Sequence, residues 1–239
     1  MAKRIWLLPI LLIPVLIVIS FPAAVVTPRL DLPSNVTQVH GSIWSGNASW
    51  QQPGWQPLLL SWRWHGGRDW HWQADGGSTQ LEGLWRPGQA TVLPSVRGQL
   101  NIDRLDVAHW LGVAKPTGIL ELDLSDVELS GRGAPSAGGK AVWRQAGLVG
   151  AVQASLGDIE IAVENSPSVT QSLQLAIRSL APAAVQVRGS IVLDQDRYNA
   201  DVWLRAASDR SDLTPALASI GELQPDGQVR VRVSGAIGL

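Results

Sequence analysis

Residues 58–74 read LLLSWRWHGGRDWHWQA, and apolar and polar side chains alternate on both sides of the glycine pair. The apolar positions on the two sides are Leu58, Leu60, Trp62 and Trp64, and then Trp70, Trp72 and Ala74. A period of two is typical of β-strands that bury one face. Pairing Trp64 with Trp70 keeps both apolar faces in register and leaves residues 66–68 as a three-residue loop. The stretch predicts a β-hairpin whose four tryptophans pack in a core.

The same alternation recurs along most of the chain. Before the hairpin, Val39, Gly41 and Ile43 alternate with polar or larger residues until Gly46 ends the run. After the hairpin, alternating runs cover residues 96–102, 120–129, 159–163, 173–177, 185–193, 198–204 and 229–237. A change of phase within residues 120–129 predicts a β-bulge near Ser125 and Asp126. The pattern predicts a mainly β protein built on a curved, mostly antiparallel sheet with one apolar face.

Three segments interrupt the alternation. Residues 103–113 and 212–221 have the apolar spacing of short helices, and Asp212 stands where an N-cap residue would begin the second one. Residues 131–139 are rich in Gly, Ala, Pro and Ser. This composition predicts the best internal boundary within a β domain that covers residues 39–239.

The N-terminus has the pattern of a membrane anchor. Residues 5–26 contain one plainly polar side chain, Ser20, and a helix of this length reaches about 33 Å, enough to span a bilayer core. Lys3 and Arg4, in a short stub of residues 1–4, predict a cytoplasmic N-terminus and export of the remainder. A cleaved signal peptide is the alternative. The proline-containing residues 27–38 are expected to form a stiff spacer.

Composition excludes several classes of function. The net charge is −1 and the isoelectric point about 6.4, so a nucleic-acid partner has no electrostatic support. The chain has no cysteine, which rules out disulfides, zinc–thiolate sites and thiol nucleophiles. In an exported protein this composition fits a bacterial periplasm.

Candidate catalytic and metal-binding groups have simpler explanations. His65 and His71 flank the hairpin loop near Asp69, but no further ligand stands at a supporting spacing. Acidic residues at 121, 123, 126 and 128 alternate mainly with leucine, which is typical of a solvated strand face. Phosphate-binding loops, nucleophile elbows and paired-histidine motifs do not occur. We therefore expect a protein that is not an enzyme and has no cofactor.

A binding surface is the remaining candidate site. Trp44, Trp50 and Trp55 alternate with small and polar residues, and an exposed apolar row there would mark a partner or lipid contact. Gly41 and Gly46 flank Trp44. We expect these glycines to serve special backbone angles or a close approach of two strands.

Five segments in order carry a resemblance to a known family: VHGSIWSG at 39–46, LSWRW at 60–64, GKAVWRQA at 139–146, RGSIVLD at 188–194 and DGQVRVRVSG at 226–235. Together with the single N-terminal anchor, they resemble the type II secretion system protein N family of Gram-negative bacteria. The resemblance implies an inner-membrane protein with a periplasmic β domain, accessory to the machine that exports folded proteins across the outer membrane. Its implied partners are other inner-membrane components of that system, with the secretin as a further candidate. It implies no catalytic residues.

A second class of function stays open. Anchored periplasmic proteins of the AsmA-like families, built from strands with one apolar face, are thought to guide lipids along a groove. An anchor and one-faced strands are features of this sequence too, so a lipid-binding or lipid-transfer role is the alternative. A dozen strands spaced about 4.8 Å apart would reach only about 60 Å, which argues against bridging the periplasm alone.

Overall fold

The computed structural model describes residues 22–23, 35–51, 56–87, 91–104, 114–129, 136–150, 153–164, 172–181, 183–194 and 197–236. The predicted anchor, apart from Pro22 and Ala23, lies outside these ranges, as do residues 105–113 of the first predicted helix. In the part of the chain that is described, no helix has the length and apolar character to cross a bilayer.

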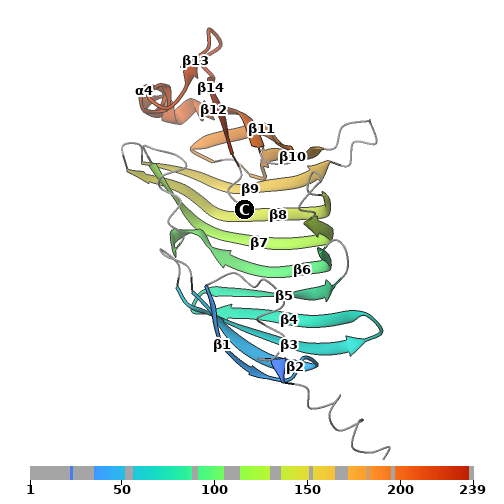
Figure 1. The fold of residues 1–239 in the computed structure, drawn as a ribbon. Helices are drawn as coiled ribbons and strands as arrows, with labels where there is room; N and C mark the ends of the chain where they lie inside the picture. The colour runs from blue at the N-terminus through green and yellow to red at the C-terminus, as the bar shows by residue number, and fades with distance from the viewer. Residues whose placement is uncertain are drawn as a thin grey trace, which may run out of the picture.

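In the described residues, fourteen strands form one open antiparallel sheet (Figure 1). Neighbours in the sheet are neighbours in the chain, except that β14 lies between β12 and β13. The strands are β1 (Val36–Gly41), β2 (Ser45–Trp50), β3 (Leu58–Gly66), β4 (Asp69–Gly76), β5 (Thr79–Arg86), β6 (Thr91–Asn101), β7 (Ala114–Leu129), β8 (Ser136–Gly150), β9 (Ala154–Glu164), β10 (Ser172–Ser179), β11 (Val185–Asp194), β12 (Arg197–Ala206), β13 (Glu222–Leu223) and β14 (Val229–Ala236). The prediction of a mainly β, antiparallel fold is confirmed.

The tryptophan-rich hairpin is β3 and β4, and Trp64 lies opposite Trp70 as predicted. The three-residue loop is wrong, because β3 continues to Gly66, which pairs with Asp69 across a two-residue turn. Gly66 and Gly67 have φ angles of +125° and +57°. These angles are easily reached by glycine, so the strands stay paired closer to the turn than the alternation indicates.

The first strand ends earlier than predicted. β1 begins at Val36 and ends at Gly41, and the chain turns through residues 42–44 into β2, so that Gly41 pairs with Gly46. Ile43 and Trp44 are therefore turn residues and not a continuation of the strand. Gly41 has a φ of +91°, which glycine adopts easily and which turns the backbone out of the strand. The alternation of side-chain types continues past Gly41, so it does not predict this turn.

The bulge predicted near Ser125 is confirmed. The register between β7 and β8 shifts between Ser125 and Glu128, and Asp126 has a φ of +49°. Of the predicted internal boundary at residues 131–139, residues 136–139 belong to β8 and residues 131–135 are not described. β7 and β8 pair with each other on both sides of the bulge.

The best-packed core lies at the C-terminal end of the sheet. Its largest fully buried side chains are Ile159, Val185, Leu217 and Val229. Leu217 belongs to the helix α4 (Thr214–Ala218), which follows the 3₁₀ turn η4 (Ser208–Leu213). A shorter 3₁₀ turn, η3 (Ile102–Arg104), lies at the start of the first predicted helix.

The second predicted helix is present, but Asp212 is not its N-cap. Leu213 takes that position, and the backbone N–H of Thr214 donates to the Ser211 carbonyl of the preceding turn. Because the 3₁₀ turn runs directly into the helix, this N–H needs no side-chain acceptor. The Asp212 carboxylate instead accepts a 3.1 Å hydrogen bond from Arg210.

Candidate interaction surface on the apolar face

A continuous row of apolar residues crosses the sheet. Strand register sets twelve residues, one from each of twelve successive strands, opposite one another: Ala48, Leu60, Ala74, Leu81, Gly98, Leu122, Ala141, Ile161, Ile177, Gly189, Val202 and Val231. Each is Ala, Val, Leu, Ile or Gly, and each is buried or half-buried. We call this set the apolar row. It runs from β2 to β14 without a polar interruption.

The opposite face of the sheet is polar over most of its length. At the positions next to the apolar row, register aligns Asn47, Ser61, Gln73, Glu82, Arg97, Asp123 and Lys140.

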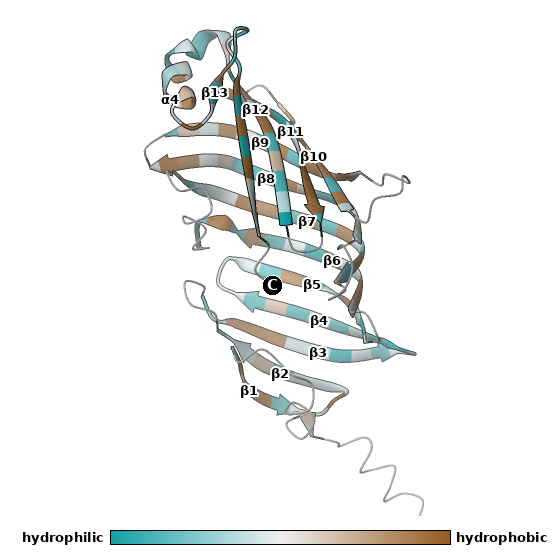
Figure 2. Cartoon of the chain, turned by 45° about the horizontal axis from the view of Figure 1, so that its top comes forward, coloured by the Kyte–Doolittle hydropathy of each residue, from teal (hydrophilic) through white to brown (hydrophobic). Residues whose placement is uncertain are grey.

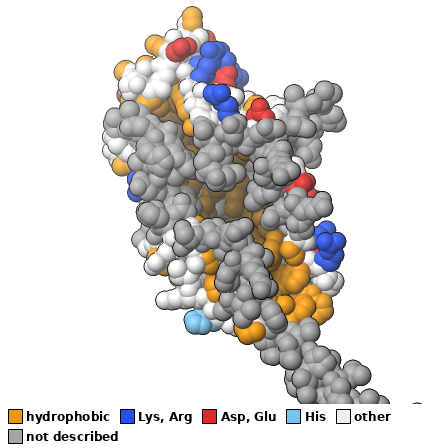
Figure 3. All heavy atoms as spheres, in the orientation of Figure 1, with side chains coloured by type: hydrophobic (Ala, Val, Ile, Leu, Met, Phe, Trp, Pro, Cys, Tyr) orange, Lys and Arg blue, Asp and Glu red, His pale blue; other side chains and the backbone are white. Residues whose placement is uncertain are grey.

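Apolar stretches recur on successive strands (Figure 2), and hydrophobic side chains gather in a hollow along the middle of the face seen in Figure 3. The prediction that one face is apolar is confirmed.

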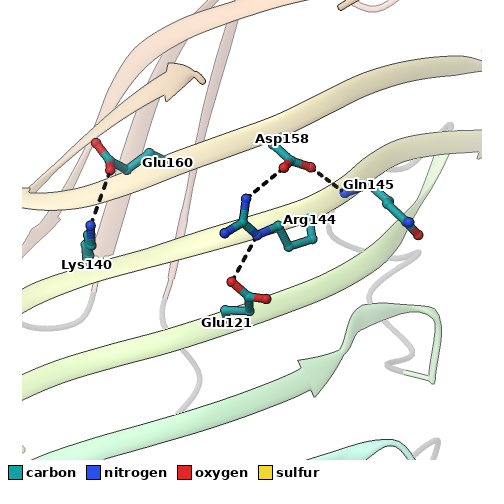
Figure 4. A network of polar contacts seen from close by, with 6 residues as sticks. All are labelled: Glu121, Lys140, Arg144, Gln145, Asp158 and Glu160. Carbon is teal, nitrogen blue, oxygen red and sulfur yellow. Dashed lines mark hydrogen bonds and ion pairs between the residues drawn. The ribbon is translucent and has the colours of Figure 1, made fainter. Parts of the chain in front are cut away.

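Ion pairs across β7, β8 and β9 stabilise the register on the polar face (Figure 4). Arg144 donates to Glu121 at 2.9 Å and to Asp158 at 2.8 Å. Asp158 also accepts from the backbone N–H of Gln145, a bulge residue with a φ of +49°. The Gln145 N–H and then the Arg144 guanidinium hold the pKa of Asp158 below its usual value. Glu121 lies on an exposed strand face, as the alternation predicts.

The turn at residues 42–44 is attached to the tryptophan hairpin by hydrogen bonds. The indole N–H groups of Trp62 and Trp70 donate to the carbonyls of Ser42 and Ile43, both at 3.1 Å. The backbone N–H of Trp64 donates to the next carbonyl, that of Trp44, at 2.6 Å. Three successive carbonyls of the turn therefore accept hydrogen bonds from one hairpin. The indole N–H groups of Trp62 and Trp70 provide two of these bonds, while their rings provide apolar surface.

Trp44 packs into the same cluster. Its ring stacks on Trp70 with 6.4 Å between centroids and meets Trp64 edge-on at 5.5 Å. The half-buried Trp50 lies in β2 opposite Val36 and Leu58. Trp55 lies outside the described residues. The structure therefore brings Trp44, of the three candidate contact residues, into the hairpin cluster.

The predicted core around the four hairpin tryptophans is wrong in part. Trp62, Trp70 and Trp72 are half-buried, but Trp64 is 46% exposed. The turn at 42–44 covers the cluster only partly, so its outer edge faces solvent. Among the candidate metal ligands, His65 is exposed and His71 lies 3.9 Å from Glu82. No three potential ligands converge in the described ranges.

Gly41 and Gly46 stand where the backbone allows no side chain. A Cβ at Gly46 would lie 2.4 Å from both the His40 carbonyl oxygen and the Trp62 ring, and one at Gly41 would lie 2.6 Å from the Ser45 carbonyl oxygen. Both distances are well inside van der Waals contact. These glycines permit the close approach of β1, β2 and the Trp62 ring.

The alternating runs in the sequence do not predict the continuity of the apolar row, because they leave out β2, β5 and β8. In β5, Leu81 and Gly83 alternate with the polar residues Gln80 and Glu82, but Leu84 breaks this alternation before Trp85. β2 carries small and polar residues, SGNASW, and its apolar member of the row is Ala48. Small residues give little hydrophobic contrast, so alternation alone does not reveal such a strand.

Residues 34–232 match the family model described as type II secretion system (T2SS), protein N. The match begins just before β1 and ends within β14, so it covers the whole sheet except its last few residues. No curated protein and no solved structure matches the chain significantly. The segments first noted for their resemblance include the turn at 42–44 and the hairpin that holds it. The chain belongs to the type II secretion system protein N family.

Proposed function

We propose that this component of the type II secretion system is an accessory protein of the bacterial inner membrane that acts by binding other components of the system. In this proposal residues 5–26 cross the membrane once, Lys3 and Arg4 stay in the cytoplasm, and the sheet lies in the periplasm. The apolar run and the basic residues before it support this topology. The protein carries out no catalysis, and its partners are other inner-membrane components, with the secretin as a further candidate.

The single observation that carries the binding role is the apolar row. An extended apolar surface on a soluble domain is costly unless something covers it, so such surfaces mark contacts with proteins or lipids. Leu122, near the middle of the row, is half-buried and retains accessible surface. A partner that covers this face would bury apolar area on both molecules, at about 25 cal/mol for each Å².

Lipid binding is the second candidate, and the continuity of the row favours it. Twelve strands contribute to the row without a charged residue, which suits a long acyl chain as well as an apolar protein segment. Fourteen strands spaced about 4.8 Å apart give a sheet about 60 Å long along its curve. In this second candidate function, the apolar face binds phospholipid and not another secretion component.

One preparation tests both candidates. The full chain is purified in mild detergent from its native host, and co-purifying secretion proteins and lipids are quantified by mass spectrometry. Leu81→Lys places a charge in the apolar row, whereas Gln80→Lys adds the same charge to the polar face of the same strand. A lysine at the half-buried Leu81 can extend its ammonium group to water, so both variants are expected to fold, which thermal unfolding verifies.

The proposal predicts that secretion components co-purify with the wild type and Gln80→Lys and are depleted with Leu81→Lys. Phospholipid that is lost only with Leu81→Lys, while protein partners are unchanged, would favour the second candidate. Equal recovery of proteins and lipids with both variants would refute a binding role for the apolar face.

A further inference from the structure

A basic pocket opens on the polar face at the C-terminal end of the sheet. Its volume is about 440 Å³, and its lining includes Arg178, Leu180, Gln186, Arg188, Trp203 and Arg205. These residues come from β10, β11 and β12 and from the turn after β10. Three of the lining residues are arginines and none is acidic. The charged side chains that line the pocket are therefore all positive.

Strand register places two of these arginines directly opposite each other. Arg178 of β10 pairs with Arg188 of β11, and like charges in this position are destabilising. Glu160, on the other side of Arg178, binds its guanidinium at 2.6 Å. Arg178 is thus compensated by a carboxylate. In the described part of the chain, neither Arg188 nor Arg205 forms an ion pair with one.

Arg188 is held in place by neutral groups. Its guanidinium donates to the Gln228 side-chain oxygen at 2.9 Å and lies 6.0 Å from the centre of the Trp203 ring. Gln228 in turn donates to the Asp226 carboxylate. On the other side of Trp203, Arg230 lies 4.7 Å from the ring centre and is bound to Asp201. Arg188 is therefore a positioned cation that lacks its own counter-charge.

We propose that this pocket binds the phosphate group of a ligand. The guanidinium group presents paired N–H donors that match phosphate oxygens. A carboxylate is satisfied by one such fork, whereas the two guanidinium groups of Arg188 and Arg205, neither of which forms an ion pair within the described residues, match a phosphate monoester with nearly two negative charges. The pocket also has room for the group that carries the phosphate. That group is either a soluble monoester or the headgroup of a phospholipid.

The test uses the full chain in nonionic detergent. Inorganic phosphate, glycerol 3-phosphate and monomeric dihexanoyl phosphatidic acid are titrated at constant ionic strength, and binding is followed by calorimetry. Acetate serves as the carboxylate probe. The double variant Arg188→Gln/Arg205→Gln removes the charges of the two arginines that form no ion pair within the described residues. Arg63→Gln/Arg68→Gln removes the same total charge from exposed positions at the other end of the sheet.

We expect saturable phosphate binding that weakens about tenfold or more in the pocket variant and is unchanged in the control, because each lost charged contact is worth about tenfold in affinity. Binding of all three phosphate compounds would show that a soluble phosphate is enough to occupy the pocket. Arginine-dependent binding of phosphatidic acid alone would show that the ligand is a phospholipid headgroup. No saturable binding, equal weakening in both variants, or equally tight acetate binding would overturn the proposal.

A stability measurement separates a missing site from a misfolded variant. Without ligand, Arg188→Gln/Arg205→Gln should unfold close to the wild-type temperature, because relief of like-charge repulsion beside Arg178 offsets the lost contacts of Arg188 with Gln228 and Trp203. Phosphate should raise the wild-type midpoint and leave that of the variant unchanged. A variant that is destabilised without ligand would instead indicate a structural role. The pocket lies on the face opposite the apolar row, so its failure would leave the proposed function untouched.

Discussion

The indole N–H of Trp62 donates a 3.1 Å hydrogen bond to the main-chain carbonyl of Ser42. This bond joins two segments of the chain that are separate in sequence: the turn after β1 and the hairpin strand β3. Because Gly46 in β2 has no side chain, the Trp62 ring fits against the turn. The glycines and tryptophans of the N-terminal region therefore act as one structural unit. This unit lies at the N-terminal end of the sheet.

Replacing Trp62 with Phe should destabilise the protein more than replacing Trp64 with Phe. Both changes shorten an aromatic ring, but only the first leaves the Ser42 carbonyl without its donor. The lost hydrogen bond costs about 1 kcal/mol, or about 2–4 °C in Tm for a protein of this size. The Trp64 indole donates to the exposed Gly67 carbonyl at 3.3 Å, where water can replace it. Equal unfolding midpoints for the two variants would contradict a stabilising role for the hydrogen bond between Trp62 and Ser42.

Hydrogen exchange gives a local readout of the same bond. Amides of residues 42–46 should exchange faster in Trp62→Phe than in the wild type, because the turn is freed from the hairpin. In Trp64→Phe they should remain protected, since the backbone N–H of residue 64 still donates to the Trp44 carbonyl.

Gly46→Ala should lower the unfolding midpoint more than Gly67→Ala. The new methyl group at residue 46 would overlap the His40 carbonyl and the Trp62 ring, whereas nothing lies within 4 Å of a Cβ at residue 67. Overpacking of this kind costs about 1–3 kcal/mol. Gly67 has a φ of +57°, so its alanine variant measures backbone strain alone. A larger loss at residue 67 would show that steric exclusion at Gly46 is unimportant.

The stability contributed by Asp158 should disappear in acid. Its pKa in the folded protein is lowered by the Gln145 N–H and by Arg144. A carboxyl with a lowered native pKa stabilises the fold above its unfolded pKa of about 3.9, and the contribution is lost as the pH falls below that value towards the native pKa. The difference in unfolding free energy between the wild type and Asp158→Asn should therefore be constant near neutrality and shrink below about pH 4.

Urea unfolding over this pH range measures that difference. Asp75→Asn is the matched control, because Asp75 is exposed and forms no ion pair within the described residues. A difference for Asp158→Asn that persists unchanged in acid would refute the role of the Arg144–Asp158 contact.

The fold class was readable from the sequence because alternation reports burial directly. Trp64 lies opposite Trp70, and the phase change at Ser125 marks a true bulge. In both places large apolar side chains give strong contrast between the two faces, and register follows from that contrast. The short helix at 214–218 could be predicted for a similar reason, since its apolar residue Leu217 is buried.

The parts that sequence reasoning missed depend on backbone conformation and on partners far along the chain. Gly41 turns the chain at a positive φ while the pattern of side-chain types still reads as a strand. Asp212 has the residue type of a helix cap, but the preceding 3₁₀ turn supplies the acceptor. The pocket around Arg188 depends on register between β10 and β11, which no local pattern reveals.

In-cell photo-crosslinking from neighbouring residues on opposite faces tests the central claim most directly. A photoreactive side chain at Leu122 or Ile191 reports on the apolar face, and one at Glu121 or Ser190 reports on the polar face of the same strands. The account predicts adducts with other type II secretion components from Leu122 and Ile191, and few from their polar neighbours. Adducts with those components that come equally from both faces, or only from Glu121 and Ser190, would contradict the claim that the apolar face is the binding surface.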